Sequence, residues 1–122
     1  GGIPVIDTGN GNLKGVPAVI DKDFASCKIA ELINADLLVV LTAVEQVAIN
    51  FGKPNQKNLS KITAEEAKTY MKEGQFAPGS MLPKIKAALI FVEAKEGRKA
   101  IITSLEKAKD AIREVAGTII TK

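Results

Sequence analysis

Two short runs contain residue types that could hold a chain of phosphates. Lys22 and Asp23 follow an apolar segment, while Gly79 and Ser80 precede a helical pattern whose first turn contains Lys84. Together the runs supply two ammonium groups, a carboxylate and the free backbone N–H groups of a helix start. Groups of this kind stabilise the charge that develops on a phosphoryl group during its transfer. The combination therefore points to phosphate binding or phosphoryl transfer.

The first run depends on an extended segment at residues 19–21. If that segment ends at the carboxyl edge of a sheet, Lys22 and Asp23 lie where open α/β folds bind their ligands. Lys22 would then meet a phosphate, and Asp23 would orient the lysines. The alternative is a solvated loop in which Asp23 serves as the N-cap of a helix that runs to about residue 33. Taken alone, the run favours that alternative.

The second run depends on a helix that starts after Ser80. Residues 85, 88, 89 and 92 are apolar at helical spacing, and Ser80 is a suitable N-cap. Gly79 lets the backbone approach a ligand, and the helix start offers N–H groups to an anion. The helix dipole disfavours a cation at Lys84, which is easier to explain if an anion binds there. An ordinary Gly-Ser turn beside a surface lysine remains the alternative.

A third group of candidates follows the continuous apolar run Leu37–Thr42, which is typical of a central strand covered on both faces. Thr42, Ala43 and Val44 end this strand, and Val47 follows shortly after. A nucleotide base could lie on such apolar side chains at the end of a strand. A plain strand end followed by a hairpin is the alternative.

The elements alternate along the chain, which predicts an α/β fold: a three-layer sandwich with a mostly parallel sheet. Further strands are expected over residues 2–6, 47–50, 99–103 and 118–121, with a hairpin tip at 7–12. Thr63-x-x-Glu66 and Thr103-x-x-Glu106 are capping boxes that predict helices ending near Gly74 and Val115. In the helix after Asp23, we expect the following residues to face inward: Phe24, Cys27, Ala30 and either Leu32 or Ile33.

The amino-acid composition excludes several kinds of catalytic and binding site. The 122 residues suit one domain, and 46% hydrophobic with 25% charged residues is normal for a globular protein. The absence of histidine excludes a Ser-His-Asp triad and a His-ligated zinc site, so catalysis must use Lys, Asp, Glu and backbone dipoles. The single cysteine fits a reducing cytoplasm. We expect neither a nucleic-acid stripe nor a membrane span, because the lysines are scattered and the apolar runs are short.

The chain resembles the C-terminal half of the carbamate kinase family, within the amino-acid kinase superfamily. The resemblance extends over nearly the whole chain. The run from Phe76 through Gly79, Ser80 and Met81 to Lys84 is its most specific part. The matching stretches are residues 1–5, 15–23, 35–42, 50–56, 74–84, 97–105 and 116–118.

The resemblance implies reversible phosphoryl transfer between ATP and carbamate, giving ADP and carbamoyl phosphate, as in fermentative arginine breakdown. It implies that Asp23 organises the active-site lysines and that Lys22 and Lys84 neutralise the transferred group. Gly1 and Gly2 match the end of a glycine-rich run near the carbamate. The implied partners are Mg²⁺ between the phosphates, with no protein metal ligand assigned, and a second copy in a homodimer. The implied nucleotide site consists of Thr42, Ala43, Val44, Val47, Gly79, Ser80 and Met81.

One departure from the family pattern is large. Family chains are much longer, and their N-terminal half supplies another catalytic lysine and most of the carbamate pocket. We therefore expect residues 1–122 to be one nucleotide-binding lobe of a longer protein, able to bind ATP or ADP weakly but to turn over little. Two alternatives stay open: another superfamily kinase, acting on an amino acid or UMP, and a catalytically silent nucleotide-binding or assembly module.

Overall fold

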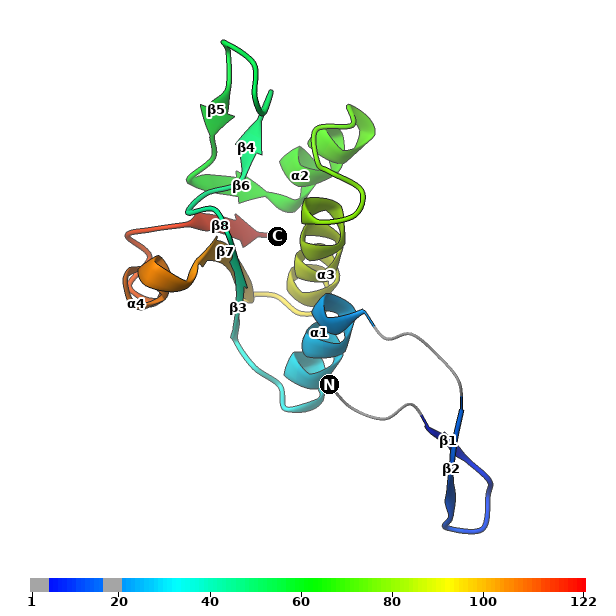
Figure 1. The fold of residues 1–122 in the computed structure, drawn as a ribbon. Coiled ribbons are helices and arrows are strands. Elements are labelled where there is room, and N and C mark those ends of the chain that lie inside the picture. Colours follow the sequence, from blue (N-terminus) through cyan, green and yellow to red (C-terminus); the bar gives the residue numbers. More distant parts are fainter. Residues whose placement is uncertain (1–4, 17–20) are drawn as a thin grey trace.

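The structure, a computed structural model, describes residues 5–16 and 21–122. Its helices and strands follow one another in the predicted alternation (Figure 1). The predicted sites Gly1 and Gly2, and residues 19 and 20 of the extended segment, lie outside the described residues. The elements are β1 (Val5–Asp7), β2 (Leu13–Gly15), α1 (Lys22–Leu32), β3 (Leu37–Thr42), β4 (Ala48–Ile49), β5 (Lys57–Asn58), β6 (Lys61–Thr63), α2 (Ala64–Lys72), α3 (Met81–Glu93), β7 (Lys99–Ser104), the 3-10 helix η1 (Leu105–Lys107), α4 (Ala108–Ile112) and β8 (Thr118–Thr121).

The central sheet has the strand order β3-β7-β8-β6. β3 and β7 are parallel over their full lengths, from Leu37 opposite Lys99 to Thr42 opposite Ser104, so their carboxyl ends share one edge. β6 is parallel to β8, whereas β7 and β8 are antiparallel. β8 runs antiparallel to β7 because η1 and α4, which connect the two strands, leave the chain near the edge of the sheet where β7 ends. The prediction of an α/β fold with a mostly parallel sheet is confirmed.

Helices cover both faces of this sheet, as a three-layer sandwich requires. α1, α2 and α3 lie on one face and α4 lies on the other (Figure 1). Alternate side chains of β7 pack on opposite faces of the sheet. Ala100 and Ile102 join the core beneath α3, while Ile101 packs with Ala111 of α4. β7 is therefore buried on both sides, in agreement with its continuous apolar sequence.

The start of α1 differs from the prediction. Asp21 is the N-cap, because its Oδ1 accepts hydrogen bonds from the backbone N–H groups of Asp23 at 2.8 Å and Phe24 at 3.3 Å. The expectation that Asp23 caps this helix is therefore wrong. α1 begins at Lys22, which places Asp23 inside the first turn and leaves its carboxylate available for another partner.

The buried face of α1 is narrower than expected. Cys27 and Ala30 are buried as predicted, but Phe24 is partly exposed, and Leu32 and Ile33 are largely exposed. The prediction for these three residues is wrong, since α3 and β3 cover one side of α1 and leave the other open. Burial, followed by the nearby Glu31 carboxylate, raises the pKa of the Cys27 thiol. This burial agrees with the prediction that Cys27 faces inward.

The two predicted capping boxes have different outcomes. Thr63 Oγ1 accepts from the Glu66 N–H at 3.2 Å, and Glu66 Oε2 accepts from the Thr63 N–H at 2.9 Å, which confirms the first. The second is wrong, because Thr103 is a fully buried residue inside β7. The helical segment after it consists of η1 and the short α4, which ends at Ile112 rather than near residue 115.

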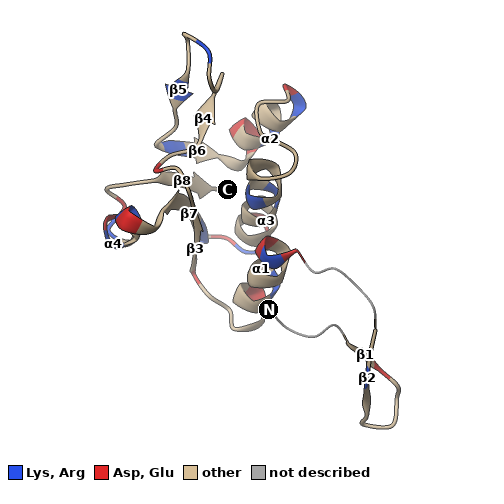
Figure 2. Cartoon of the chain, in the orientation of Figure 1, with Lys and Arg blue, Asp and Glu red and all other residues tan. Residues whose placement is uncertain are grey.

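Two antiparallel hairpins extend from the sandwich. β1 pairs with β2 around the predicted tip at residues 7–12, and this hairpin projects away from the sheet (Figure 1). β4 pairs with β5 to form a second hairpin beside the sheet. Basic and acidic residues are interspersed along the helices (Figure 2). Among the described helices, none is both long and apolar enough to span a membrane.

Candidate functional site

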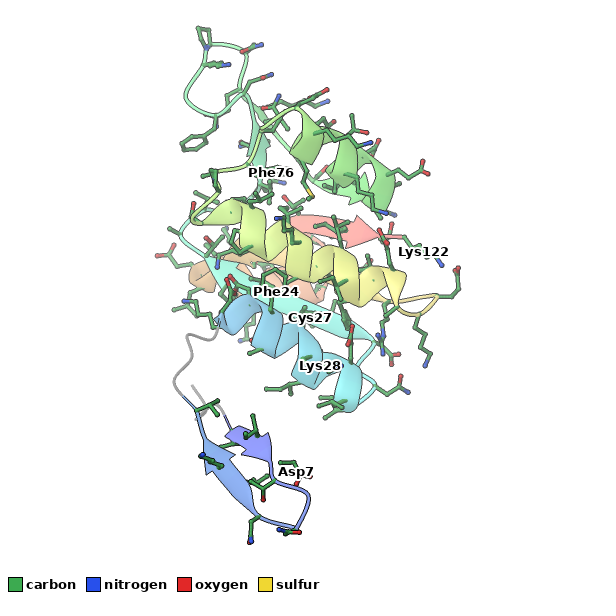
Figure 3. The ribbon with its side chains drawn as sticks, turned by 90° about the vertical axis from the view of Figure 1, so that its right-hand side faces the viewer. Asp7, Phe24, Cys27, Lys28, Phe76 and Lys122 are labelled. Atoms are coloured by element: carbon green, nitrogen blue, oxygen red, sulfur yellow. The ribbon has the colours of Figure 1, made fainter. Side chains whose placement is uncertain are left out.

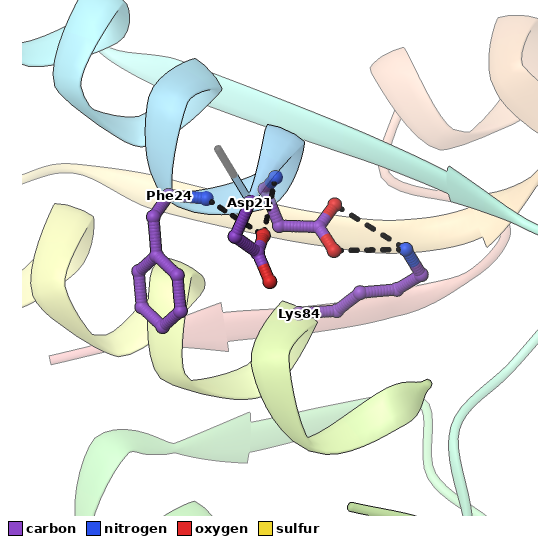
Figure 4. A network of polar contacts seen from close by, with 4 residues as sticks. Asp21, Phe24 and Lys84 are labelled. Carbon is purple, nitrogen blue, oxygen red and sulfur yellow. Dashed lines mark hydrogen bonds and ion pairs between the residues drawn. The ribbon is translucent and has the colours of Figure 1, made fainter. Parts of the chain in front are cut away.

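The first turns of α1 and α3 are joined by a charged pair. Lys84 Nζ lies 3.1 Å from Asp23 Oδ2 and 3.3 Å from Asp23 Oδ1 (Figure 4). Each of the two side chains is 12% exposed. The two residues are 61 positions apart in sequence, so the packing of α1 against α3 brings them together.

The pair balances two opposite effects of the helix dipoles. A carboxylate is favoured at a helix N-terminus, whereas an ammonium group is disfavoured there. Asp23 therefore suits its place in α1, and its charge offsets the unfavourable place of Lys84 in α3. An ammonium group has three N–H donors, and Asp23 engages at most two of them. The remaining donor and the residual exposure of Lys84 allow it to bind an anion.

The structure separates the two predicted lysines. Lys22 is the exposed first residue of α1, and the ion pairs between described residues include Lys84 with Asp23 but not Lys22. The sequence expectation grouped both ammonium groups around one aspartate. The geometry places Lys84 in that arrangement and leaves Lys22 in solvent beside it.

A cavity of about 270 Å³ lies next to the start of α3. The end of β3, the β4–β5 hairpin, the loop before α3 and the first residue of α3 form its walls. The lining residues are Thr42, Ala43, Val44, Gln46, Ala48, Phe51, Gln75, Phe76, Ala77, Ser80 and Met81. Thus the runs 42–44 and 80–81, which are more than thirty positions apart in sequence, face one cavity.

Two predicted members lie outside that lining. Val47 is fully buried in the core, and its N–H donates to Thr118 Oγ1 at 2.8 Å. Gly79 is exposed and precedes the lining residue Ser80. Ser80 occupies the N-cap position of α3 as predicted, but its side chain makes no capping hydrogen bond to the described residues. Its hydroxyl is available to a ligand.

Sequence reasoning did not assign six of the lining residues. Gln46, Ala48 and Phe51 come from the hairpin region, and Gln75, Phe76 and Ala77 from the loop leading into α3. Phe76 is labelled in Figure 3, in the segment just before α3. A signal was present, because Phe51 and Phe76 lie in stretches that carry the family resemblance. Which of these residues face a common cavity became evident only from the folded arrangement.

The β4–β5 hairpin is tied to β8 at its base. Thr118, fully buried, accepts the Val47 N–H and donates its hydroxyl to the Leu59 carbonyl oxygen at 2.5 Å. Leu59 N–H donates to the Val47 carbonyl at 2.8 Å, and Gln46 Nε2 donates to the Gly117 carbonyl at 3.3 Å. These bonds fix one end of the cavity wall to the central sheet.

A second, more open hollow adjoins the cavity at the carboxyl ends of β3 and β7. Its volume is about 420 Å³, and it shares Thr42 and Ala43 with the cavity. Ser104 and Lys107 lie on its other side. The two spaces together follow the edge of the parallel strands, where α/β sheets bind ligands.

Comparisons with known proteins agree with this architecture. The model of the amino acid kinase family matches residues 1–104. Carbamate kinases of Clostridium perfringens and Latilactobacillus sakei are 56% and 55% identical to the chain over all of its 122 residues. The structure of a carbamate kinase from Giardia lamblia bound to AMP-PNP superposes on the whole chain with a TM-score of 0.91 and 44% identity.

In each of these three comparisons the chain spans 38% of the length of the relative. The family model nevertheless covers most of the chain, and the two carbamate kinases cover all of it. The resemblance found in the sequence is thereby confirmed: this protein belongs to the amino acid kinase family.

Proposed function

We propose that this chain is the nucleotide-binding part of a carbamate kinase, which transfers a phosphoryl group reversibly between ATP and carbamate. One observation carries the proposal: the Lys84–Asp23 pair lies one helical turn from Ser80 and Met81, which line the cavity. A cation that would bind phosphate and a largely apolar cavity are thus adjacent. The names of the relatives, and the AMP-PNP of the Giardia lamblia structure, support the same assignment.

The cavity would take the base of the nucleotide. Its volume of about 270 Å³ is just below the range of roughly 300–1,000 Å³ for ligand pockets, which suits a base better than a whole nucleotide. Val44, Phe76 and Met81 supply apolar surface, while Thr42 and Gln46 supply polar groups. The sugar and phosphates would then leave through the open side.

The start of α3 would hold the phosphates. In its first turn the Leu82 N–H donates to the Ala77 carbonyl at 3.0 Å and Pro83 has no N–H, so the Met81 N–H is the group that would face an anion there. Ser80 would add a hydroxyl, and Lys84 would add the positive charge. The described residues contain no cluster of three or more potential metal ligands. This is compatible with Mg²⁺, which is usually held by substrate phosphates with one or two carboxylates.

Catalysis in this proposal rests on position and charge rather than on a proton-transferring base. Phosphoryl transfer passes through a loose transition state whose charge must be compensated, and bound Mg²⁺ would neutralise part of it. Lys84 would neutralise the transferred group, and Asp23 would keep its ammonium in place. Lys22 would act as a second cation, a role that rests on the resemblance alone. The lack of histidine is therefore no obstacle.

Several further proposals rest on the resemblance alone. These are the binding of carbamate near Gly1 and Gly2, a homodimer, a cytoplasmic location and a place in arginine breakdown. A second candidate function is a nucleotide-binding module without turnover.

Calorimetry of this chain with Mg·ADP tests the proposal. We expect binding with a Kd in the upper part of the range of about 1 μM to 1 mM typical of enzyme substrates. We also expect little ATP synthesis from ADP and carbamoyl phosphate. Absence of ADP binding would contradict the nucleotide site. Robust ATP synthesis would contradict the expectation that these residues alone lack a working carbamate site, and it would exclude the silent module.

A further inference from the structure

Two segments of the cavity wall that are distant in sequence are joined by a contact. Asn50 at the end of β4 and Gln75 before α3 form a reciprocal amide pair. The Asn50 N–H donates to Gln75 Oε1 at 2.8 Å, and Gln75 Nε2 donates to Asn50 Oδ1 at 3.3 Å. We call these two residues the amide latch. It joins the β4–β5 hairpin to the loop that leads into α3.

Each member of the latch is followed directly by a phenylalanine of the cavity wall. Phe51 follows Asn50 on the hairpin, and Phe76 follows Gln75 on the loop. Phe76 is only 4% exposed, whereas Phe51 is 70% exposed although it lines the cavity. The latch therefore sets the spacing between a fixed aromatic wall and a more open one.

The two halves of the latch are anchored unequally. The Gln75 N–H donates to the Tyr70 carbonyl of α2 at 3.0 Å, and Gln75 Nε2 also approaches Glu73 Oε2 at 3.4 Å. Asn50 belongs to a hairpin whose strands have two residues each, and such a hairpin is weak by itself. β8 holds the base of this hairpin through Thr118, whereas the latch holds the end that carries Phe51.

The backbone at Asn50 supports a positional role. Its φ is +54°, in the left-handed region that asparagine tolerates better than most residues. The side chain and the N–H of the same residue both bond to Gln75, so the tight turn and the latch are one feature. Without the latch, the turn would have fewer partners to hold it in this conformation.

We propose that the amide latch is a positioning device that selects for the nucleoside part of the ligand. This inference rests on the proposed function. The latch holds Phe51 against the open side of a bound base, while Lys84 and the start of α3 hold the phosphates independently. If the latch is broken, the hairpin must be ordered at the moment of binding, and that cost lowers affinity for ligands that carry a base. Ligands that consist of phosphate alone are unaffected.

Gln75→Met tests this inference, with Gln56→Met as the matched control. Gln56 makes a similar pair of bonds, accepting from the Gly52 N–H at 3.0 Å and donating to Asn58 Oδ1 at 3.3 Å, but it stays within the hairpin. Calorimetry of the full chain would use Mg·ADP and Mg·pyrophosphate. We expect Gln75→Met to raise the Kd for ADP about tenfold and to leave the Kd for pyrophosphate within about twofold. Gln56→Met should change neither.

Asn50→Asp provides a conservative rescue, because it keeps an acceptor for Gln75 Nε2 and tolerates the positive φ. We expect it to bind ADP like the unchanged chain. Equal weakening of ADP and pyrophosphate in Gln75→Met, or unchanged ADP binding, would overturn the inference. So would an unchanged chain that binds ADP but not pyrophosphate. An unchanged chain that binds no ADP would instead overturn the proposed function.

Discussion

Lys84→Met is expected to lower phosphoryl transfer by at least about 10³-fold, the loss found when a group that compensates transition-state charge is removed. Methionine keeps most of the apolar stem but removes the ammonium group next to Asp23. The measurement is carbamoyl-phosphate-dependent ATP synthesis by the complete kinase that contains these residues. Mg·pyrophosphate binding to this chain should be lost as well, because the same group would hold the phosphates.

Lys86→Met is the matched control for this prediction. It makes the same change two residues along α3, at an exposed lysine that borders a different hollow with Met71 and Leu82. We expect activity within about twofold of the unchanged protein, as for a surface residue away from the site. If Lys84→Met retained substantial activity, or if both substitutions had equal effects, the role proposed for Lys84 would be wrong.

The variant Asp23→Asn separates stability from chemistry. Removing either charge leaves its largely buried partner uncompensated, so each single variant should be less stable to urea. The double variant Asp23→Asn/Lys84→Met should lose less stability than the sum of the two. Asp23→Asn should still bind pyrophosphate, because Lys84 keeps its charge, whereas every variant without Lys84 should not. The pattern distinguishes a positioning carboxylate from a phosphate ligand.

Gly117→Ala is expected to cause the largest loss of stability. Gly117 has a φ of +82°, and an added Cβ would lie 2.9 Å from the Ile102 carbonyl oxygen and 2.9 Å from Thr103 Cβ. Left-handed strain of about 1–2 kcal/mol and overpacking of about 1–3 kcal/mol should together cost roughly 3 kcal/mol. Since Ile102 and Thr103 belong to the central strand β7, they have little room to move. Urea unfolding of the two proteins measures the difference.

Gly97→Ala separates the two contributions. Gly97 has a φ of +84°, but a Cβ there would have no neighbour within 4 Å. Its substitution should therefore cost only the backbone strain of about 1–2 kcal/mol. A similar loss for both variants would show that the close approach of Gly117 to β7 contributes nothing. Gly117→Ala should also weaken ADP binding, because the Gly117 carbonyl accepts the bond from Gln46 in the cavity wall.

Much of this arrangement was predictable from residue type and order. Lys99–Ser104 is a buried strand because both faces of the sheet are covered there, and its continuous apolar run reports that condition directly. Leu37–Thr42 is equally apolar, but it forms β3, the edge strand of the described sheet, in which Leu41 is 42% exposed, so the prediction of a central strand covered on both faces is wrong. The proximity of Asp23 to Lys84 was inferable from topology, since the helices beside parallel strands begin near the same edge. The pairing itself depends on how α1 packs against α3, which no local pattern records.

The errors have specific physical causes. Asp21 and Asp23 are equally good caps by residue type, and only the helix start distinguishes them. Thr103 has the residue type of an N-cap, but threonine is also common in β-strands. Its burial depends on the neighbouring strands β3 and β8, which the local sequence does not show. The contact between Asn50 and Gln75 joins two loops 25 positions apart, so it follows from the tertiary arrangement alone.

A crystal structure of this chain with Mg·ADP tests the central claim most directly. The account predicts the base in the cavity lined by Val44, Phe76 and Met81, and the terminal phosphate within hydrogen-bond distance of Lys84 Nζ. A nucleotide bound elsewhere, or one in that cavity whose phosphates turn away from Lys84, would contradict it.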